Sequence, residues 1–264
     1  MADRKFETIL TAKEGKILRI TMNRPQVHNA FNATMIGDLA EAFSTARSDE
    51  GIRIVILTGA GESFCAGADL NWMREIIHYS YEQNLRESLQ VAELMKAIYE
   101  FPKPTIARVN GAVIGGGTGL LSACDIVVAS DKARFGLSEV KIGLIPAAIG
   151  PYVIRRIGES ATRELFLTGE RFDARRALEI GLVNKVVPDA ALDDKVEEIV
   201  RLLLSSAPEA IAKCKELLRR VPGMSLEEAK GYTAEMIAGL RVSPEGQEGM
   251  ASFLEKRKPS WAKD

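Results

Sequence analysis

The run Ile52-Arg53-Ile54-Val55-Ile56-Leu57, closed by Thr58-Gly59-Ala60-Gly61, decides the fold class of this chain. All but one of the residues in the run are apolar, and glycines follow it directly. A short apolar run that ends in glycines is typical of a strand buried on both faces of a parallel sheet. We therefore expect this strand to lie in the middle of a sheet.

The segments on either side of this run predict more strands and the helices that cover them. Residues 6–11 and 16–22 are rich in β-formers, and Gly15 between them predicts an antiparallel hairpin. Apolar residues at helical spacing predict helices over 32–47 and 82–101, and short apolar runs predict strands at 105–109 and 125–129. Since strands and helices alternate up to about residue 190, the fold class is α/β.

Beyond Pro188 the pattern predicts helices alone. Pro208 and Ser243-Pro244 are helix starts, and Ser225 to Glu228 forms a capping box. A helical appendage of about 70 residues is too small for a good core of its own, so it should pack on the main domain or on another subunit. We expect a core over 1–195 that holds the site and a helical oligomerisation region over 196–264.

Composition restricts the function. The chain has 264 residues with a net charge of −1, which lacks the basic surplus of a dedicated nucleic-acid binder. Neither a signal peptide nor a membrane span of roughly 18 apolar residues is apparent, so we expect a cytoplasmic protein without a membrane partner. Three scattered cysteines and two histidines predict neither disulfides nor a metal site.

Three segments stand out: Ser63 to Leu70, Asn110 to Gly117, and Phe135 to Glu139 with the following Gly143-Leu144-Ile145-Pro146. The glycines do not form a dinucleotide fingerprint, because Leu120 and Phe64 stand where the third glycine belongs. In their order and spacing, the segments resemble the enoyl-CoA hydratase/isomerase superfamily, also called the crotonase family. The resemblance extends from Asn23-Arg24-Pro25 to residues 253–258.

This resemblance implies a crotonase-like spiral of ββα units with a C-terminal helical trimerisation region, assembled as a trimer or a dimer of trimers. It implies acyl-CoA thioester substrates, with coenzyme A as part of the substrate and no prosthetic group or metal. Chemistry next to a thioester carbonyl puts negative charge on its oxygen, and two fixed backbone N–H donors stabilise that charge by about 3 kcal/mol each. By resemblance these donors belong to Ala68 and Gly116, and the acid–base group is Glu139.

The resemblance also implies binding positions. Those for coenzyme A are Arg24, Ala66, Asp69 and Leu70, with Phe253 and Lys256 supplied by a neighbouring subunit. Those for the acyl group are Trp72, Gly119, Ile149 and Tyr152. From spacing alone, Glu139 has a competing interpretation as a surface charge paired with Lys141 on one strand face.

Gly119 departs from the hydratase pattern, which has the first of two glutamates at this position. With one carboxylate, hydration needs Glu139 for both proton transfers, whereas shifting a 3-enoyl to a 2-enoyl thioester needs only one carboxylate. Residues 137–147 and 150–153 further resemble a bacterial subgroup that includes methylglutaconyl-CoA and carboxygeranoyl-CoA hydratases, in which glycine can occupy this place. We therefore predict a hydratase-type lyase, with an isomerase as the alternative, and expect Gly119→Glu to leave the fold intact.

Two hypotheses that assign a function other than catalysis remain. A mitochondrial member of the family binds RNA, but the near-neutral charge argues against that function here. A CoA-binding protein that has lost its activity is the other, since Gly119 removes a carboxylate.

Overall fold

A six-stranded mixed sheet forms the centre of the molecule in the computed structural model, which describes residues 6–262. The strand order is β1-β2-β3-β5-β7-β10. Every residue of β3 is buried, and β3 lies inside the sheet, which confirms the expectation for the run from Ile52. The bounds are β1 (Ile9–Glu14), β2 (Ile17–Met22), β3 (Ile54–Gly59), β5 (Thr105–Val109), β7 (Ile126–Ser130) and β10 (Lys185–Val187).

Strands β1 and β2 form the predicted antiparallel hairpin, and the remaining neighbours in this sheet are parallel. Helices α1 (Ala33–Ser48) and α3 (Tyr81–Tyr99) confirm the predicted helices within one or two residues. Asn32 accepts a hydrogen bond from the amide of Met35 and so caps α1, while Ser80 and Gln83 form a capping box for α3.

A second sheet of four short strands was not predicted. It consists of β4 (Ser63–Cys65), β6 (Ala112–Ile114), β8 (Arg134–Gly136) and β9 (Arg171–Asp173). Strands β4, β6 and β8 are parallel neighbours, whereas β9 is antiparallel to β8. Because the first three strands are parallel, the segments that follow them leave the sheet from the same edge.

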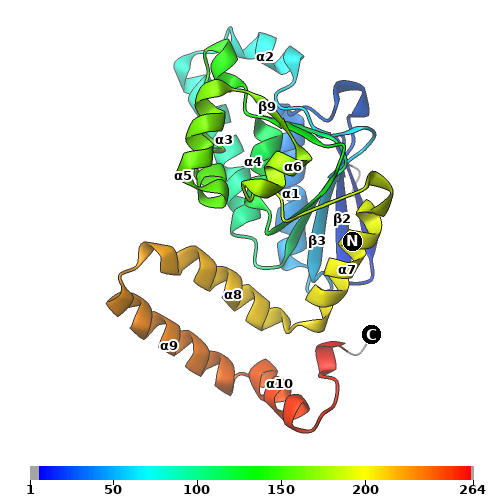
Figure 1. The fold of residues 1–264 in the computed structure, drawn as a ribbon, viewed down its shortest axis with the longest axis vertical. Helices are drawn as coiled ribbons and strands as arrows, with labels where there is room; N and C mark the ends of the chain where they lie inside the picture. The colour runs from blue at the N-terminus through cyan, green and yellow to red at the C-terminus, as the bar shows by residue number, and fades with distance from the viewer. Residues whose placement is uncertain (1–5, 263–264) are drawn as a thin grey trace.

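Helices cover both faces of the large sheet (Figure 1). The main core lies between one face and a layer that includes α1, α3, α4 (Gly116–Ala123) and α5 (Gly150–Thr168). On the opposite face, Leu192, Val196 and Val200 of α7 (Leu192–Ser205) pack on Ile54 and other residues. The expected domain boundary after residue 195 therefore falls inside α7, which belongs to the body. The remaining bounds in the body are α2 (Leu70–Ile76) and α6 (Ala174–Glu179), with 3-10 helices at Pro25–Val27, Glu139–Ile142 and Asp189–Ala191.

The last helices form an arm, which we define as α8 (Pro208–Arg220), α9 (Leu226–Val242) and α10 (Pro244–Leu254), with 3-10 helices at Val221–Gly223 and Ser260–Ala262. The arm projects at the end of the molecule opposite α2 (Figure 1). Lys215 of α8 joins it to the body by donating to the carbonyl of Lys103 at 3.0 Å and by an ion pair with Asp125.

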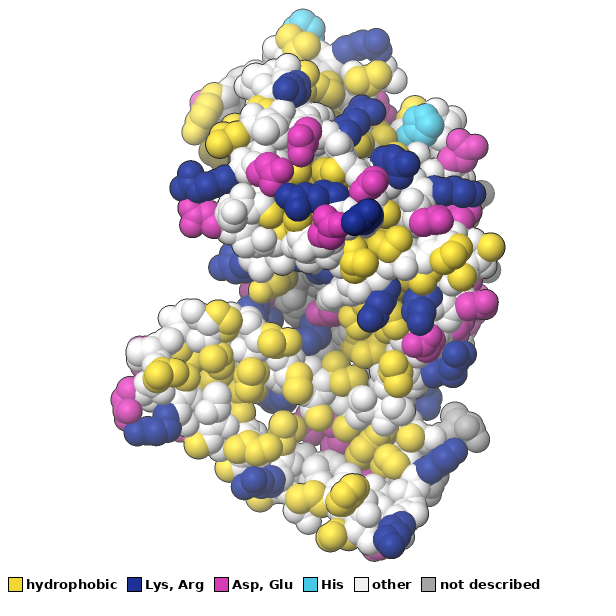
Figure 2. Space-filling model, viewed as in Figure 1, with side chains coloured by type: hydrophobic (Ala, Val, Ile, Leu, Met, Phe, Trp, Pro, Cys, Tyr) yellow, Lys and Arg dark blue, Asp and Glu magenta, His cyan; other side chains and the backbone are white. Residues whose placement is uncertain are grey.

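The arm exposes much apolar surface, seen as patches over its helices in Figure 2. Leu226 is 92% exposed and Phe253 is 82% exposed. The arm therefore lacks a complete core of its own, as expected for a helical region of about 70 residues. Within residues 6–262, none of the helices has both the length and the apolar content required to cross a bilayer.

Candidate active site

Three segments singled out in the sequence include residues of β4, β6 and β8, and the residues that follow each strand meet at one edge of the small sheet. Ser63 pairs with Ala112, and Ala112 pairs with Arg134, so the strands run side by side in the same direction. Residues 66–69, the start of α4 and residues 137–139 consequently lie next to each other. The unpredicted sheet brings the candidate residues together.

Phe31 fastens two of these segments to each other. Its amide donates to the carbonyl of Gly67 at 2.6 Å, and its carbonyl accepts from the amide of Asp69 at 2.7 Å. Its ring lies on Gly116, where a Cβ atom would come within 2.7 Å of ring carbon Cε2. The sequence analysis did not single out Phe31, because the contact joins residues 85 positions apart.

The amides of Ala68 and Gly116 are available to a ligand. In the part of the chain that the structure describes, neither N–H group donates a hydrogen bond to the protein. Gly116 is the first residue of α4, where the helix places a positive partial charge. Gly115 before it has a φ of 49°, which a residue with a side chain rarely adopts.

Glu139 points toward the start of α4. A Cβ atom on Gly115 would lie 2.9 Å from Oε1 of Glu139, and Oε2 is buried without a hydrogen-bond partner among residues 6–262. Burial raises the pKa of this carboxyl, since water no longer stabilises its charged form. A carboxyl with a raised pKa and one oxygen free of protein contacts is suited to exchange protons.

The competing interpretation of Glu139 as a surface charge paired with Lys141 is wrong. The segment Glu139–Ile142 is a 3-10 helix and not an extended strand, so the two side chains do not share a strand face. Lys141 is exposed, and the described residues show no ion pair between it and Glu139.

Ile149 occupies the space next to Gly119. A Cβ atom on Gly119 would lie 2.7 Å from Cβ of Ile149, closer still to its Cγ2 atom, and 3.4 Å from Cε of Met95. Both Gly119 and Ile149 are buried. A glutamate at 119 would therefore require Ile149 to move, which argues against the expectation that Gly119→Glu leaves the fold intact.

Arg24 and Asp69 form an ion pair beside the loop that contains Ala68. Their ion pair is 2.6 Å long, and Asp69 is only 5% exposed in its side chain. Asp69 also caps α2 by accepting from the amide of Asn71 at 2.7 Å. Burial opposes the charge of Asp69, but the hydrogen bonds from Asn71 and Arg24 outweigh it, so the pKa of Asp69 lies below its ordinary value.

Arg24 also donates to the carbonyl of Ala30 at 2.8 Å, so its guanidinium supports this loop. Contact of Arg24 or Asp69 with coenzyme A stays a prediction. Of the two other positions expected to bind it from this segment, Leu70 is 70% exposed and Ala66 is half-buried.

Cys65 ends β4 immediately before this loop and has no nucleophilic role. It is fully buried, and burial raises the pKa of its thiol to about 12. The reactive form of cysteine is the thiolate, which is essentially absent at such a pKa. The described residues also contain no group of three side chains arranged to hold a metal ion.

Trp72 lines a cleft of about 410 Å³ between α2, α3 and the segment after the Glu139 helix. The amide of Leu144 in this segment donates to the carbonyl of Glu139 at 3.0 Å, so the wall of the cleft is tied to the candidate acid–base residue. The lining residues are Trp72, Ile76, Asn84, Glu87, Ser88, Val91, Gly143, Leu144 and Ile145.

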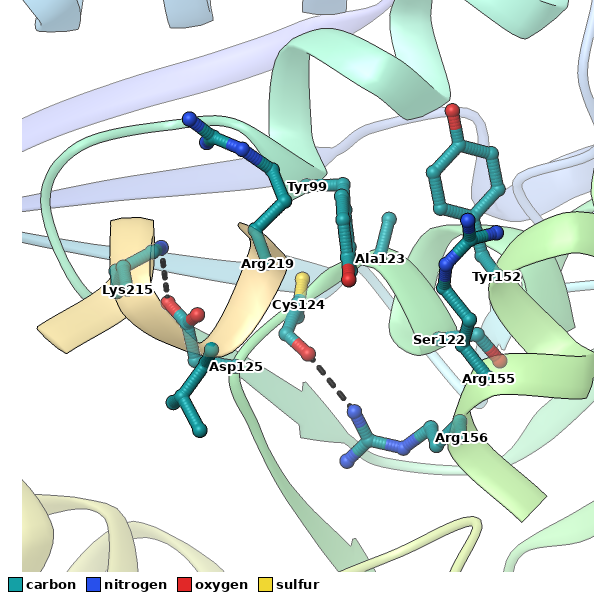
Figure 3. A pocket seen from close by; sticks show the side chains of 11 residues that line it. Tyr99, Ser122, Ala123, Cys124, Asp125, Tyr152, Arg155, Arg156, Lys215 and Arg219 are labelled. Atoms are coloured by element: carbon teal, nitrogen blue, oxygen red, sulfur yellow. Dashed lines mark hydrogen bonds and ion pairs between the residues drawn. The ribbon is translucent and has the colours of Figure 1, made fainter. Parts of the chain in front are cut away.

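Tyr152 and Ile149, also expected to contact the acyl group, do not line this cleft. Tyr152 lines a different cavity of about 210 Å³, where its ring packs against Tyr99 with centroids 5.4 Å apart. Figure 3 shows this cavity with the ion pair of Lys215 and Asp125 on one wall. Tyr152 does not line the Trp72 cleft because it lies in the first turn of α5 and faces the end of α3. Ile149 does not line it because its side chain packs against Gly119.

Phe253 and Lys256 lie at the end of the arm, away from α2 and the loop that precedes it (Figure 1). Both are exposed. Within one chain the fold does not bring them to the candidate site, so a contact with coenzyme A would have to come from another copy.

Residues 12–264 match the family described as enoyl-CoA hydratase/isomerase. This chain belongs to that family. A short-chain-enoyl-CoA hydratase from Clostridium acetobutylicum is 33% identical and covers 96% of this chain and 97% of its own length. The 2,3-dehydroadipyl-CoA hydratase of Escherichia coli is 31% identical, with 96% of this chain and 98% of that protein covered.

The crystal structure of an enoyl-CoA hydratase from Shewanella pealeana matches with a TM-score of 0.95 and 41% identity, covering 98% of this chain and 97% of that one. The predicted α/β crotonase fold is thereby confirmed, and the structure shows that it contains two mixed sheets besides the C-terminal helices. The protein is an enzyme of the enoyl-CoA hydratase family, a lyase that acts on acyl-CoA thioesters. Members of this family generally use no prosthetic group.

Proposed function

We propose that the protein adds water across the double bond of a 2-enoyl-CoA thioester, or removes it in the reverse direction, with Glu139 as the acid–base residue. One observation carries this proposal. Oε2 of Glu139 is buried without a hydrogen-bond partner among the described residues, and Oε1 lies next to Gly115 at the start of α4, where a free amide is available. The Oε2 atom can take a proton and return it without first breaking a protein contact.

The thioester oxygen would lie between the amides of Ala68 and Gly116. As water attacks the β-carbon, the Glu139 carboxylate removes a proton from the water. The electrons of the double bond shift toward the carbonyl, so that an enolate with its charge on the thioester oxygen forms. The two amides, together with the positive end of α4, stabilise that charge. The same carboxyl then protonates the α-carbon, which completes the addition and regenerates the carboxylate.

Isomerisation is the second candidate, and the packing of Ile149 on Gly119 favours it. Because Ile149 fills the space beside Gly119, a second carboxylate at that position would require Ile149 to move. A double-bond shift from a 3-enoyl to a 2-enoyl thioester needs only one carboxylate, which removes a proton from one carbon and returns it to another.

Incubation with 2-enoyl and 3-enoyl thioesters in water enriched in heavy oxygen tests the two reactions. Hydration puts the label into a 3-hydroxyacyl product that mass spectrometry detects. A shifted double bond without label would instead establish isomerisation. Turnover of neither substrate, with tight binding of coenzyme A, would support a binding protein without activity.

The assembly belongs to the same proposal. We infer a trimer or a dimer of trimers in which Phe253 and Lys256 of one copy reach the coenzyme A of another, supported by the exposed apolar surface of the arm. A cytoplasmic location and membership of the subgroup that resembles residues 137–153 stay predictions.

A further inference from the structure

The cleft lined by Trp72, one wall of which is hydrogen-bonded through the amide of Leu144 to the carbonyl of Glu139, has one largely polar wall and one apolar wall. Asn84, Glu87, Ser88 and Val91 lie on one face of α3, because residues three, four and seven positions apart on a helix are neighbours. The facing wall consists of apolar side chains from α2 and the segment 143–145. An acyl chain that enters from the side of Glu139 would pass between these two walls.

Glu87 gives the cleft a negative charge that no lining residue balances. It is the single ionisable side chain among the described residues that line the cleft. Its Oε2 atom accepts a hydrogen bond from the indole Nε1 of Trp72 at 3.1 Å, which fixes the carboxylate against the wall. An indole N–H neutralises no charge, so the cleft keeps the full charge of the carboxylate.

The cations that are nearest to the lining residues along the chain lie outside the cleft. Arg74 donates to Oδ1 of Asn71 at 2.6 Å on the exposed surface of α2, Arg86 is exposed on α3, and Lys141 is exposed before the segment 143–145. None of the three lines the cleft. A second carboxylate placed there would therefore meet a like charge without a compensating partner, which is unfavourable in a partly desolvated site.

We propose that Glu87 selects the acyl group by charge, so that the cleft takes uncharged acyl chains and rejects those with a carboxylate at the far end. This inference rests on the proposed function, since it assumes an acyl thioester with its carbonyl near Glu139. The proposal gives this chain a different acyl group from those of the methylglutaconyl-CoA and carboxygeranoyl-CoA hydratases that residues 137–153 resemble. The names of those enzymes denote acyl groups with a distal carboxylate.

Binding of saturated thioesters tests the inference without requiring turnover. Hexanoyl-CoA and adipyl-CoA have acyl chains of equal carbon number and differ by the distal carboxylate. Titration calorimetry on the full-length protein should give an affinity for hexanoyl-CoA at least tenfold higher than for adipyl-CoA. Coenzyme A alone serves as the reference for the part that both ligands share.

Two variants assign the effect to Glu87. In Glu87→Gln, whose amide oxygen can still accept from Trp72, the ratio of the two affinities should fall to within about threefold. Glu93→Gln, which removes the same charge from an exposed position of α3, should keep the ratio of the unmodified protein. If the ratio is near one in the unmodified protein, or stays at tenfold in Glu87→Gln, the inference is wrong while the proposed function stands. If neither thioester binds more tightly than coenzyme A, the placement of the acyl group fails and the proposed function fails with it.

Discussion

At the scale of single residues, the environment of Glu139 leads to a direct prediction. Glu139→Gln keeps the shape of the side chain but cannot exchange a proton, so kcat on an enoyl thioester should fall by several orders of magnitude. Affinity for coenzyme A should stay nearly unchanged, because the substitution leaves the loop of Ala68 intact. Steady-state kinetics and calorimetry measure the two quantities.

Glu93→Gln is the matched control for this variant and should keep full activity, since Glu93 lies exposed on α3. If Glu139→Gln retained most of its activity, another group would have to be the base.

The raised pKa of Glu139 predicts opposite effects of pH on activity and on stability. The base must be ionised, so kcat/KM should rise with pH through the raised pKa of the folded enzyme. The folded protein holds this proton more tightly than the unfolded chain does. Folding therefore loses stability as the pH rises from the ordinary pKa of glutamate to the raised one, and the loss is complete above it.

Glu139→Gln removes this penalty. At pH 8 its melting temperature should equal or exceed that of the unmodified protein, and below the ordinary pKa of glutamate the difference should disappear. Thermal melts across this pH range measure the effect. A variant that is less stable at pH 8 would mean that Glu139 makes favourable contacts when charged.

The packing of Ile149 on Gly119 reverses the usual effect of replacing a helical glycine. Alanine in a helix interior is ordinarily more stable than glycine by roughly 0.5–1 kcal/mol. In Gly119→Ala the added Cβ atom would lie 2.7 Å from Cβ of Ile149, so the melting temperature should fall.

Gly231→Ala in α9 is the control, because a Cβ atom there meets nothing within 4 Å, and it should leave stability equal or higher. A stabilised Gly119→Ala would show that Ile149 moves aside easily, and Gly119→Glu would then become worth testing for faster hydration.

Sequence predicted Glu139 because it stands in a specific local string, Phe135 to Glu139, but could not predict its surroundings. The contact of Gly119 with Ile149 joins two helices across thirty residues, and that of Phe31 with Gly116 joins more distant segments. Local patterns carry no information on such contacts. For the same reason the sequence could not show that Tyr152 faces Tyr99 in a cavity other than the one that Trp72 lines, and its contact with the acyl group stays a prediction.

At the scale of elements, the strands that position the site are those that periodicity detects least well. The strands of the large sheet have three to six residues, and most were predicted from apolar runs. Strands β4, β6 and β8 have three residues each, too few for an alternating pattern to be recognised. The sequence nevertheless marked the segments that follow them, because glycines are required where the chain leaves the sheet close to other backbone.

The loop between β4 and α2 depends on Asp69, which serves both as a helix cap and as the partner of Arg24. Asp69→Ala removes both interactions and should lower the unfolding free energy by about 1–2 kcal/mol, with a fall in kcat/KM as the Ala68 amide shifts. Asp69→Asn keeps an oxygen for the cap but loses the charge. Its unfolding free energy and its kcat/KM should therefore lie between those of the unmodified protein and those of Asp69→Ala.

The pH dependence distinguishes the two roles of Asp69. Its pKa is lowered in the folded state, so the ion pair stabilises the protein above the ordinary pKa of aspartate, and this contribution is lost as the pH falls through the lowered value. Chemical denaturation should show that the unfolding free energies of the unmodified protein and of Asp69→Asn approach each other as the pH is lowered. A difference that is constant with pH would assign the effect to the cap alone.

At the scale of the whole molecule, the arm separates the predicted binding residues Phe253 and Lys256 from the site at the small sheet. Exposed apolar side chains on the arm, including Leu226 and Val242, favour burial against another copy. If the copies associate through the arm, the site of one chain is completed by the end of the next. Association and affinity for coenzyme A should then depend on the same surface.

A mixture of two defective variants tests this arrangement. Lys256→Ala should raise KM for the thioester with little change in kcat, whereas Glu139→Gln should abolish turnover. When the two are expressed together, some sites combine an intact Glu139 from one chain with an intact Lys256 from its neighbour. Those sites should show the KM of the unmodified enzyme in a biphasic saturation curve. If Lys256 acted within its own chain, every active site in the mixture would carry the Lys256→Ala defect, and the curve would keep a single high KM.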